Sequence, residues 1–142
     1  LVGRADNPPV SLEDQLECAR EVVWSDGGSE IVVVAKASAT ACVGVDQAVM
    51  PKPGPASLAT AGSGDVLAGM MASYLAQSHG ECADLPLMCA LVCEVHGYAG
   101  SLAAEAFGTR GVMAGDLIDR IGLAADVVEE HALVPDEGGA EA

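Results

Sequence analysis

The chain has 142 residues, of which 51% are hydrophobic and 19% are charged. This length and composition fit one modest globular domain and argue against a disordered acidic tail. The formal net charge of -15 argues against nucleic acid and anionic membranes as partners, because such a surface repels them. A nucleotide can still bind such a chain through a local arrangement of backbone amides, a few cations and a metal ion.

The five cysteines are odd in number and show no CxxC spacing. That pattern argues against a disulfide framework and against a metal site held by the protein, and no metal ligand is assigned. It favours a reducing, cytoplasmic setting. We expect no signal peptide and no apolar stretch long enough to cross a membrane.

The first third of the chain predicts one helix followed by strands. Ser11, with Asp14 three residues later, is typical of a helix start. Residues 29–36 predict a strand, and their continuous Ile and Val run is typical of a parallel strand covered on both faces. Residues 40–45 and 47–50 then predict a hairpin.

The rest of the chain predicts three further helices. After a Pro- and Gly-rich loop at residues 51–55, helices are expected over residues 64–78, 86–107 and 115–121. Residues 135–142 predict a frayed tail. One strand, a hairpin and these helices make an incomplete α/β layer. Its exposed sheet edge would need another chain segment to cover it.

The segment ATAGSGDVLAG, residues 59–69, is the candidate site. Gly62 and Gly64 can adopt backbone angles closed to other residues, so that successive amides point into one concavity. A helix begins there and adds free amide donors and partial positive charge, which together suit a transferring phosphate. Asp65, in the first turn, can accept a proton from a hydroxyl that attacks phosphorus. A bare Gly-x-Gly-Asp is more often ordinary turn and capping chemistry, and this string is neither a Walker P-loop nor a dinucleotide fingerprint.

Four other polar residues each have an ordinary structural interpretation. Lys36, at the end of the predicted strand, is either a snorkelling lysine or a phosphate contact. Thr40 is either a plain strand residue or a nucleotide contact. His96 lies on an apolar helix face, where a hydrogen-bonded core histidine is the more frequent case. Asp116 predicts a charge at a helix start.

The longer string over residues 58–69 resembles the signature of the ATP- or ADP-dependent NAD(P)H-hydrate dehydratases, a family of the ribokinase-like superfamily. Upstream, residues 32–40 are similar to the family's strand that ends in Lys-Gly-x-x-Thr. Downstream, residues 96–100 and 115–118 are similar to its His-Gly-x-Ala-Gly and Ser-Asp-Leu-Ile segments. The resemblance runs from about residue 11 to residue 121.

The resemblance implies a ribokinase-like three-layer α/β fold. Residues 1–134 would be its C-terminal half, an incomplete sheet flanked by helices, and residues 135–142 a disordered tail. The chain opens at Leu1 without an initiator Met, so we expect an N-terminal half to be missing. A homo-oligomer or association with that half is expected, and the isolated chain should show little turnover.

The implied activity is the repair of hydrated NADH or NADPH. A nucleotide, ATP or ADP, phosphorylates the hydroxyl of the hydrated ring, phosphate leaves, and the intact cofactor is restored. Asp65 would contact the hydrate and act as the base, and a magnesium ion would offset phosphate charge. The residues implied to bind the nucleotide, with the first three as the anion hole, are Gly62, Ser63, Gly64, Lys36, Ala37, Ser38, Ala39 and Thr40.

The chain departs from the family pattern at three places. Ala37 stands where the family usually has Gly, Pro55-Ala56-Ser57 where it has Asn-Pro-Gly, and Ser101 where it has Asp. Two alternatives stay open. One is a small-molecule kinase of the same superfamily that phosphorylates a sugar or a vitamin-precursor alcohol. The other is a non-catalytic half-domain that is completed by a partner chain.

Overall fold

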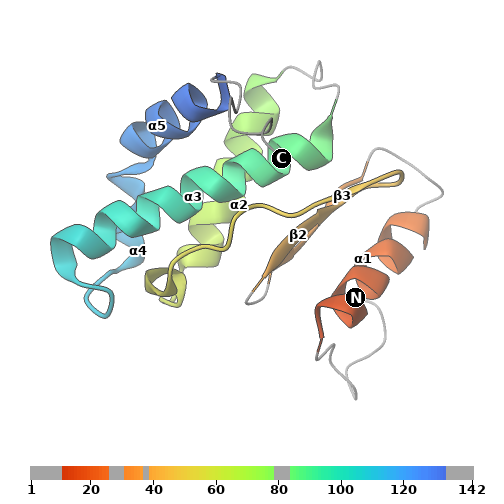
Figure 1. Cartoon of the computed structure of the whole chain (residues 1–142), viewed down its shortest axis with the longest axis horizontal. Coiled ribbons are helices and arrows are strands. Elements are labelled where there is room, and N and C mark those ends of the chain that lie inside the picture. The colour runs from red at the N-terminus through yellow and green to blue at the C-terminus, as the bar shows by residue number, and fades with distance from the viewer. Residues whose placement is uncertain (1–10, 26–30, 37–38, 79–83, 134–142) are drawn as a thin grey trace, which may run out of the picture.

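The computed structural model describes residues 11–25, 31–36, 39–78 and 84–133. The predicted tail, together with Ala37 and Ser38, lies outside these ranges. Figure 1 shows the elements in chain order, which are α1 (Leu12–Ser25), β1 (Val33–Lys36), β2 (Thr40–Val43), β3 (Ala48–Val49), the 3-10 helix η1 (Ala56–Leu58), α2 (Ser63–Gln77), α3 (Leu85–Phe107), α4 (Ala114–Ile118) and α5 (Ile121–Leu133).

The predicted start of α1 is confirmed. The backbone amide of Ser11 donates to Asp14 Oδ2 at 3.1 Å, and the amide of Asp14 donates to Ser11 Oγ at 3.1 Å. These reciprocal bonds satisfy two amides that have no partner within the helix. Ala19 and Val23 are buried on the face of α1 that packs against the sheet.

The sheet has the order β1-β2-β3 and is antiparallel throughout. The predicted hairpin at residues 40–50 is confirmed as β2 and β3. A second hairpin, in which Lys36 pairs with Thr40, was not predicted. The prediction that the strand at residues 29–36 is parallel to its neighbour is wrong where β1 pairs with β2. β1 begins at Val33, because its pairing ends opposite Val43.

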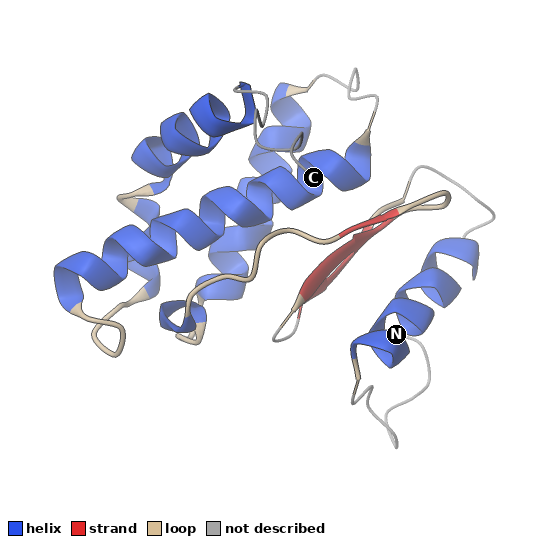
Figure 2. Cartoon of the chain, in the orientation of Figure 1, coloured by secondary structure: helices blue, strands red, loops and turns tan. Residues whose placement is uncertain are grey.

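Both β1 and β2 contact the cores on the two faces of the sheet, but β1 is only half-buried whereas β2 is nearly fully buried. The neighbouring side chains of β2 alternate between two cores, as the pleat requires. Ala41 and Val43 pack with α1, whereas Cys42 packs with α3. Figure 2 shows the resulting layers, with the sheet between α1 and the group of helices that contains α3.

α3 is the central helix of the described structure. It contacts α2, α4, α5, η1, β2 and β3. Its start follows from local chemistry, because Asp84 accepts the amide of Leu87 at 2.9 Å and Pro86 occupies the first turn. By length and composition alone, α3 is long and apolar enough to cross a membrane, which corrects the expectation that no stretch is. More than half of its most apolar stretch is buried within the structure.

The last predicted helix, over residues 115–121, corresponds to α4. α4 ends at Ile118, and a separate helix, α5, begins at Ile121 after a turn in which the amide of Arg120 donates to Leu117 O at 3.0 Å. α5 was not predicted. Its side chains at residues 121, 124, 125 and 128 pack on the core around α3. Leu117 of α4 is fully buried in a separate small cluster with Ala103 and Val112.

Candidate functional site

The turn before α2 adopts a left-handed backbone at Gly62, whereas Gly64, which was also expected to need unusual backbone angles, has ordinary helical backbone. Gly62 is the N-cap of α2, with φ 85° and ψ -9°. Its carbonyl accepts the amides of Asp65 and Val66, each at 3.1 Å, and the amide of Ser63 donates to Thr60 O at 3.3 Å. Among the described residues, the amides of Gly62 and Gly64 have no acceptor. Of the three residues of the predicted anion hole, Gly62 and Gly64 therefore keep amides that are available to an anion.

The helix mouth opens to solvent. Gly64 and Asp65 are both exposed, and a methyl group added at Gly64 would meet nothing within 4 Å. Ala68 and Gly69, one turn later, are also exposed. The N-terminal end of α2 carries the partial positive charge of its peptide dipoles. The described residues thus form the floor of a site whose other side they leave open.

Ser63 faces the interior instead of this opening. The residue is buried, and its hydroxyl donates to Leu58 O at 2.6 Å. Its own carbonyl lies 2.9 Å from Nε2 of His96, which is 2% exposed. Because a carbonyl only accepts, Nε2 carries the proton. The interpretation of His96 as a hydrogen-bonded core histidine is confirmed.

The environment of His96 favours its neutral form. Burial lowers the pKa of the His96 imidazole, the bond to the Ser63 carbonyl opposes that shift, and the charge of Lys36 lowers the pKa further. The same lysine lowers the pKa of Cys93, which also belongs to α3. Lys36 lies on the same face of β1 as Val34, which packs against the core around α3.

The predicted nucleotide-binding residues that the structure describes lie in two segments. Lys36 is exposed and pairs with Thr40 at the end of the β1–β2 hairpin, and Ala39 and Thr40 are half-buried. Gly62, Ser63 and Gly64 form the turn before α2. Asp65 lies in the first turn of that helix.

Three buried cysteines lie beneath this region. The free thiols of Cys42 of β2 and Cys93 of α3 are hydrogen-bonded, which raises the pKa of Cys42 and lowers that of Cys93. Burial acts to raise the pKa of both thiols. Cys89, one turn before Cys93, is buried in the same core. Within the described ranges, no three side chains of His, Cys, Asp or Glu are grouped to hold a metal ion.

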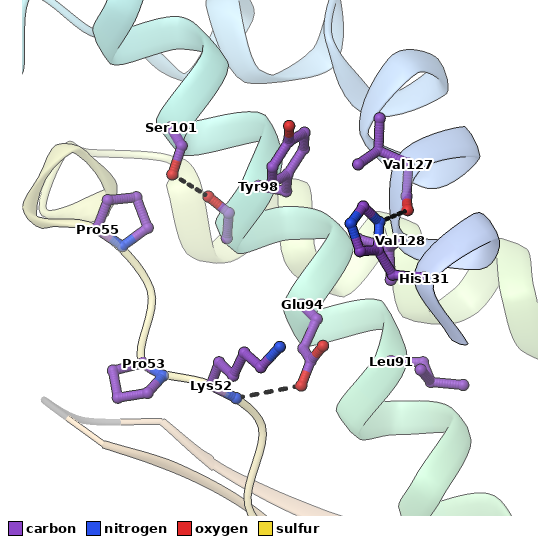
Figure 3. A pocket seen from close by; sticks show the side chains of 11 residues that line it. Lys52, Pro53, Pro55, Leu91, Glu94, Tyr98, Ser101, Val127, Val128 and His131 are labelled. Carbon is purple, nitrogen blue, oxygen red and sulfur yellow. Dashed lines mark hydrogen bonds between the residues drawn. The ribbon is translucent and has the colours of Figure 1, made fainter. Parts of the chain in front are cut away.

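A separate cavity of about 510 Å³ lies between residues 52–55, α3 and α5 (Figure 3). On one wall, the amide of Lys52 donates to Glu94 Oε1 at 3.3 Å. On the other, Nδ1 of His131 donates to the carbonyl of Val127 at 2.7 Å. None of the predicted site residues lines this cavity. The sequence analysis missed it because one wall belongs to the unpredicted helix α5.

The fold matches that of two solved structures. These are Bacillus subtilis YxkO, a member of the UPF0031 family, with a TM-score of 0.67 and 21% identity, and SMU.573 from Streptococcus mutans, with a TM-score of 0.66 and 24% identity. Each match covers 82% of this chain, and 41% and 40% of the two proteins. The chain thus has the predicted ribokinase-like α/β fold, as an incomplete sheet flanked by helices.

The family follows from sequence comparison. The family model described as NAD(P)H-hydrate dehydratase matches residues 1–122. The chain is 33% identical over 108 residues to the bifunctional NAD(P)H-hydrate repair enzyme Nnr of Escherichia coli, and 36% identical over 122 residues to that of Moorella thermoacetica. These matches cover 76% and 84% of this chain. The chain belongs to the NAD(P)H-hydrate dehydratase family. It spans 20% and 21% of the length of these two relatives.

Proposed function

We propose that this chain carries the phosphate-holding turn and the catalytic carboxylate of a cytoplasmic enzyme that repairs hydrated NADH or NADPH. One juxtaposition supports the proposal most directly. The available amide of Gly64 and the exposed carboxylate of Asp65 lie side by side at the open N-terminal end of α2. A phosphate and a hydroxyl-bearing substrate can therefore meet at one helix end.

The reaction has two stages. The terminal phosphate of ATP or ADP rests on the amides of Gly62 and Gly64, where the helix end favours negative charge. The oxygen of the ring hydroxyl forms a bond to phosphorus, the bond between phosphorus and the rest of the nucleotide breaks, and Asp65 takes the hydroxyl proton. Phosphate then leaves the ring together with a proton from the adjacent carbon, which restores the double bond of NADH or NADPH.

The nucleotide needs further cationic support on a chain of net charge -15. Lys36 supplies one cation at the end of the β1–β2 hairpin, where Ala37, Ser38, Ala39 and Thr40 would follow the phosphates or ribose. Magnesium, when bound, supplies charge neutralisation. The described residues form no cage of three ligating side chains. The ion would therefore be held through the nucleotide's own phosphates.

An activity assay on the full-length protein tests this proposal. NADH hydrate is incubated with ATP or with ADP, and the absorbance of NADH is followed. Restored absorbance with either nucleotide supports the dehydratase. A stable phosphorylated alcohol, formed from a sugar or vitamin precursor and without NADH repair, supports the small-molecule kinase instead. The isolated 142-residue chain should show little turnover, because the residues that the structure describes leave the site open on one side.

A further inference from the structure

The segment at residues 96–100 has no role in the reaction described above, yet it touches the backbone that forms the site. Three of its residues lie on the face of α3 that meets residues 54–63. His96 donates to the carbonyl of Ser63 at 2.9 Å. The carbonyl of Gly100 accepts the buried hydroxyl of Ser57 at 2.8 Å. One turn of α3 therefore holds two points of the chain that leads into α2.

The two glycines of this segment lie where α3 closely approaches residues 54–58. A methyl group added at Gly97 would lie 3.6 Å from the Cα of Gly54, so two backbones meet there. A methyl group added at Gly100 would lie 2.6 Å from Leu58 Cδ2 and 3.0 Å from its Cγ. Real side chains do not approach this closely, so a larger residue at Gly100 must displace Leu58. Leu58 is itself tied to the site, because its carbonyl accepts the hydroxyl of Ser63.

The bond from His96 has a direct consequence for the neighbouring amide. The carbonyl of Ser63 and the N–H of Gly64 belong to one peptide unit, which is planar and trans. The two groups therefore point in opposite directions, and a bond that fixes one fixes the other. Ser63 and Gly64 are the first two residues of α2, so the N–H of Gly64 faces the N-terminal end of the helix, where no described residue accepts it, and His96 holds the carbonyl on the opposite side of the same peptide. A hydrogen bond to the carbonyl also polarises the peptide and strengthens its N–H as a donor.

We propose that His96 is a positioning residue that aims the Gly64 amide at the transferring phosphate through the Ser63–Gly64 peptide, with Gly97 and Gly100 allowing the close contact. This inference rests on the proposed function. His96 touches neither substrate nor nucleotide and acts only through the peptide it holds. Its imidazole makes the bond in either protonation state, because Nε2 keeps its proton in both.

The test compares His96→Leu with His96→Gln in the full-length protein. In glutamine, Nε2 lies the same number of bonds from Cβ as in histidine, so the amide can donate to the same carbonyl. His96→Leu should lower kcat about 10- to 100-fold and leave the KM for NADH hydrate within about twofold. The reason is that the Gly64 amide, no longer held in place, stabilises mainly the transition state. His96→Gln should recover most of the loss. Tyr98→Leu, an exposed position on the same helix, should keep the normal kcat.

Three outcomes would overturn the inference. One is an unchanged kcat per folded molecule in His96→Leu. Another is an equal loss of kcat in the leucine and glutamine variants. A third concerns the contact between Gly100 and Leu58. Gly100→Ala should lower kcat, and adding Leu58→Ala should restore kcat by removing the atoms that collide with the new methyl group. A double variant whose kcat is no higher than that of Gly100→Ala counts against the proposal.

The variant Asp65→Asn separates this inference from the proposed function. If Asp65→Asn loses turnover while His96→Leu does not, the positioning role fails and the proposed function stands. If Asp65→Asn keeps turnover while His96→Leu loses it, the proposed role of Asp65 fails and the positioning role stands.

Discussion

Alanine at Gly62 and alanine at Gly64 should change the stability of the chain in opposite directions. Gly62 has φ 85°, and a left-handed backbone costs a residue with a side chain about 1–2 kcal/mol. The new methyl group would also lie 3.1 Å from Cβ of Ala114, which is tighter than ordinary contact. The alanine restricts the unfolded chain, which returns about 0.4–1 kcal/mol. The net result for Gly62→Ala is a destabilisation of about 1 kcal/mol.

Gly64 differs because it already has helical backbone in α2. A methyl group there meets nothing within 4 Å, so no atom has to move. Alanine is favoured over glycine inside a helix by about 0.5–1 kcal/mol, so Gly64→Ala should stabilise the chain. The two variants should therefore differ by about 2 kcal/mol in their free energies of unfolding.

Urea denaturation of the 142-residue chain, followed by circular dichroism, measures this difference. With a slope of about 1.5 kcal/mol per molar urea, the two midpoints should lie more than about 1 M apart. Gly69→Ala is a matched control, because it is helical and equally open, and it should behave like Gly64→Ala. Equal midpoints for Gly62→Ala and Gly64→Ala, or the reverse order, would refute the reasoning. In the full-length protein, Gly64→Ala should nevertheless lose about tenfold in turnover, because its methyl group occupies the space where phosphate approaches.

Three further predictions concern catalysis, packing and pH. Asp65→Asn in the full-length protein should lower turnover by about two to four orders of magnitude, as expected for loss of a general base. The control Asp119→Asn, at an exposed position, should keep normal turnover. Near-normal NADH recovery in Asp65→Asn would show that Asp65 is not the general base. Leu117→Ala should lower the free energy of unfolding, measured by urea denaturation, by about 2–5 kcal/mol, because the side chain is fully buried. A change within about 0.5 kcal/mol would contradict the place of Leu117 in the core. Because the pKa of His96 is lowered below 6.5 in the folded chain, the unfolded chain binds more protons as the pH falls below that value. The contribution of His96 to the free energy of unfolding should be full above about pH 6.5 and should fall below that pH. His96→Gln should remove this part of the pH dependence. If the free energies of unfolding of the two proteins change with pH in parallel, His96 is not the cause.

The helices α1, α2 and α3 could be predicted because their boundaries follow from local chemistry. Ser11 with Asp14 and Pro86 after Asp84 are helix starts whose bonds involve residues three positions apart. The start of α2 followed from its glycines in the same way. α5 was not predicted, although its apolar residues at 121, 124, 125 and 128 show the same local regularity.

Burial could not be predicted in the same way, because it depends on which residues let two elements approach closely. The Ile and Val run of β1 indicated a strand covered on both faces, but Val33 and Val34 are half-buried, whereas the smaller Ala41 and Cys42 of β2 are fully buried. On α3, Leu91 is apolar and large, yet it is 37% exposed. The buried face of α3 contains small residues instead, such as Ala90, Ala99 and Gly100. Close packing of helices and loops selects for small size as well as apolarity.

The candidate site shows the same limit at the scale of a motif. From the string alone, Gly62, Ser63 and Gly64 were equivalent members of an anion hole. In the structure Ser63 turns its hydroxyl and its carbonyl inward, and only its glycine neighbours keep amides that no described residue accepts. The partner of the Ser63 carbonyl is His96, which lies 33 residues further along the chain, so no pattern confined to residues 59–69 contains that contact. The two motifs therefore form one structural unit, and transplanting the Gly-x-Gly-Asp turn without its supporting turn of α3 should transfer the amides but not their direction.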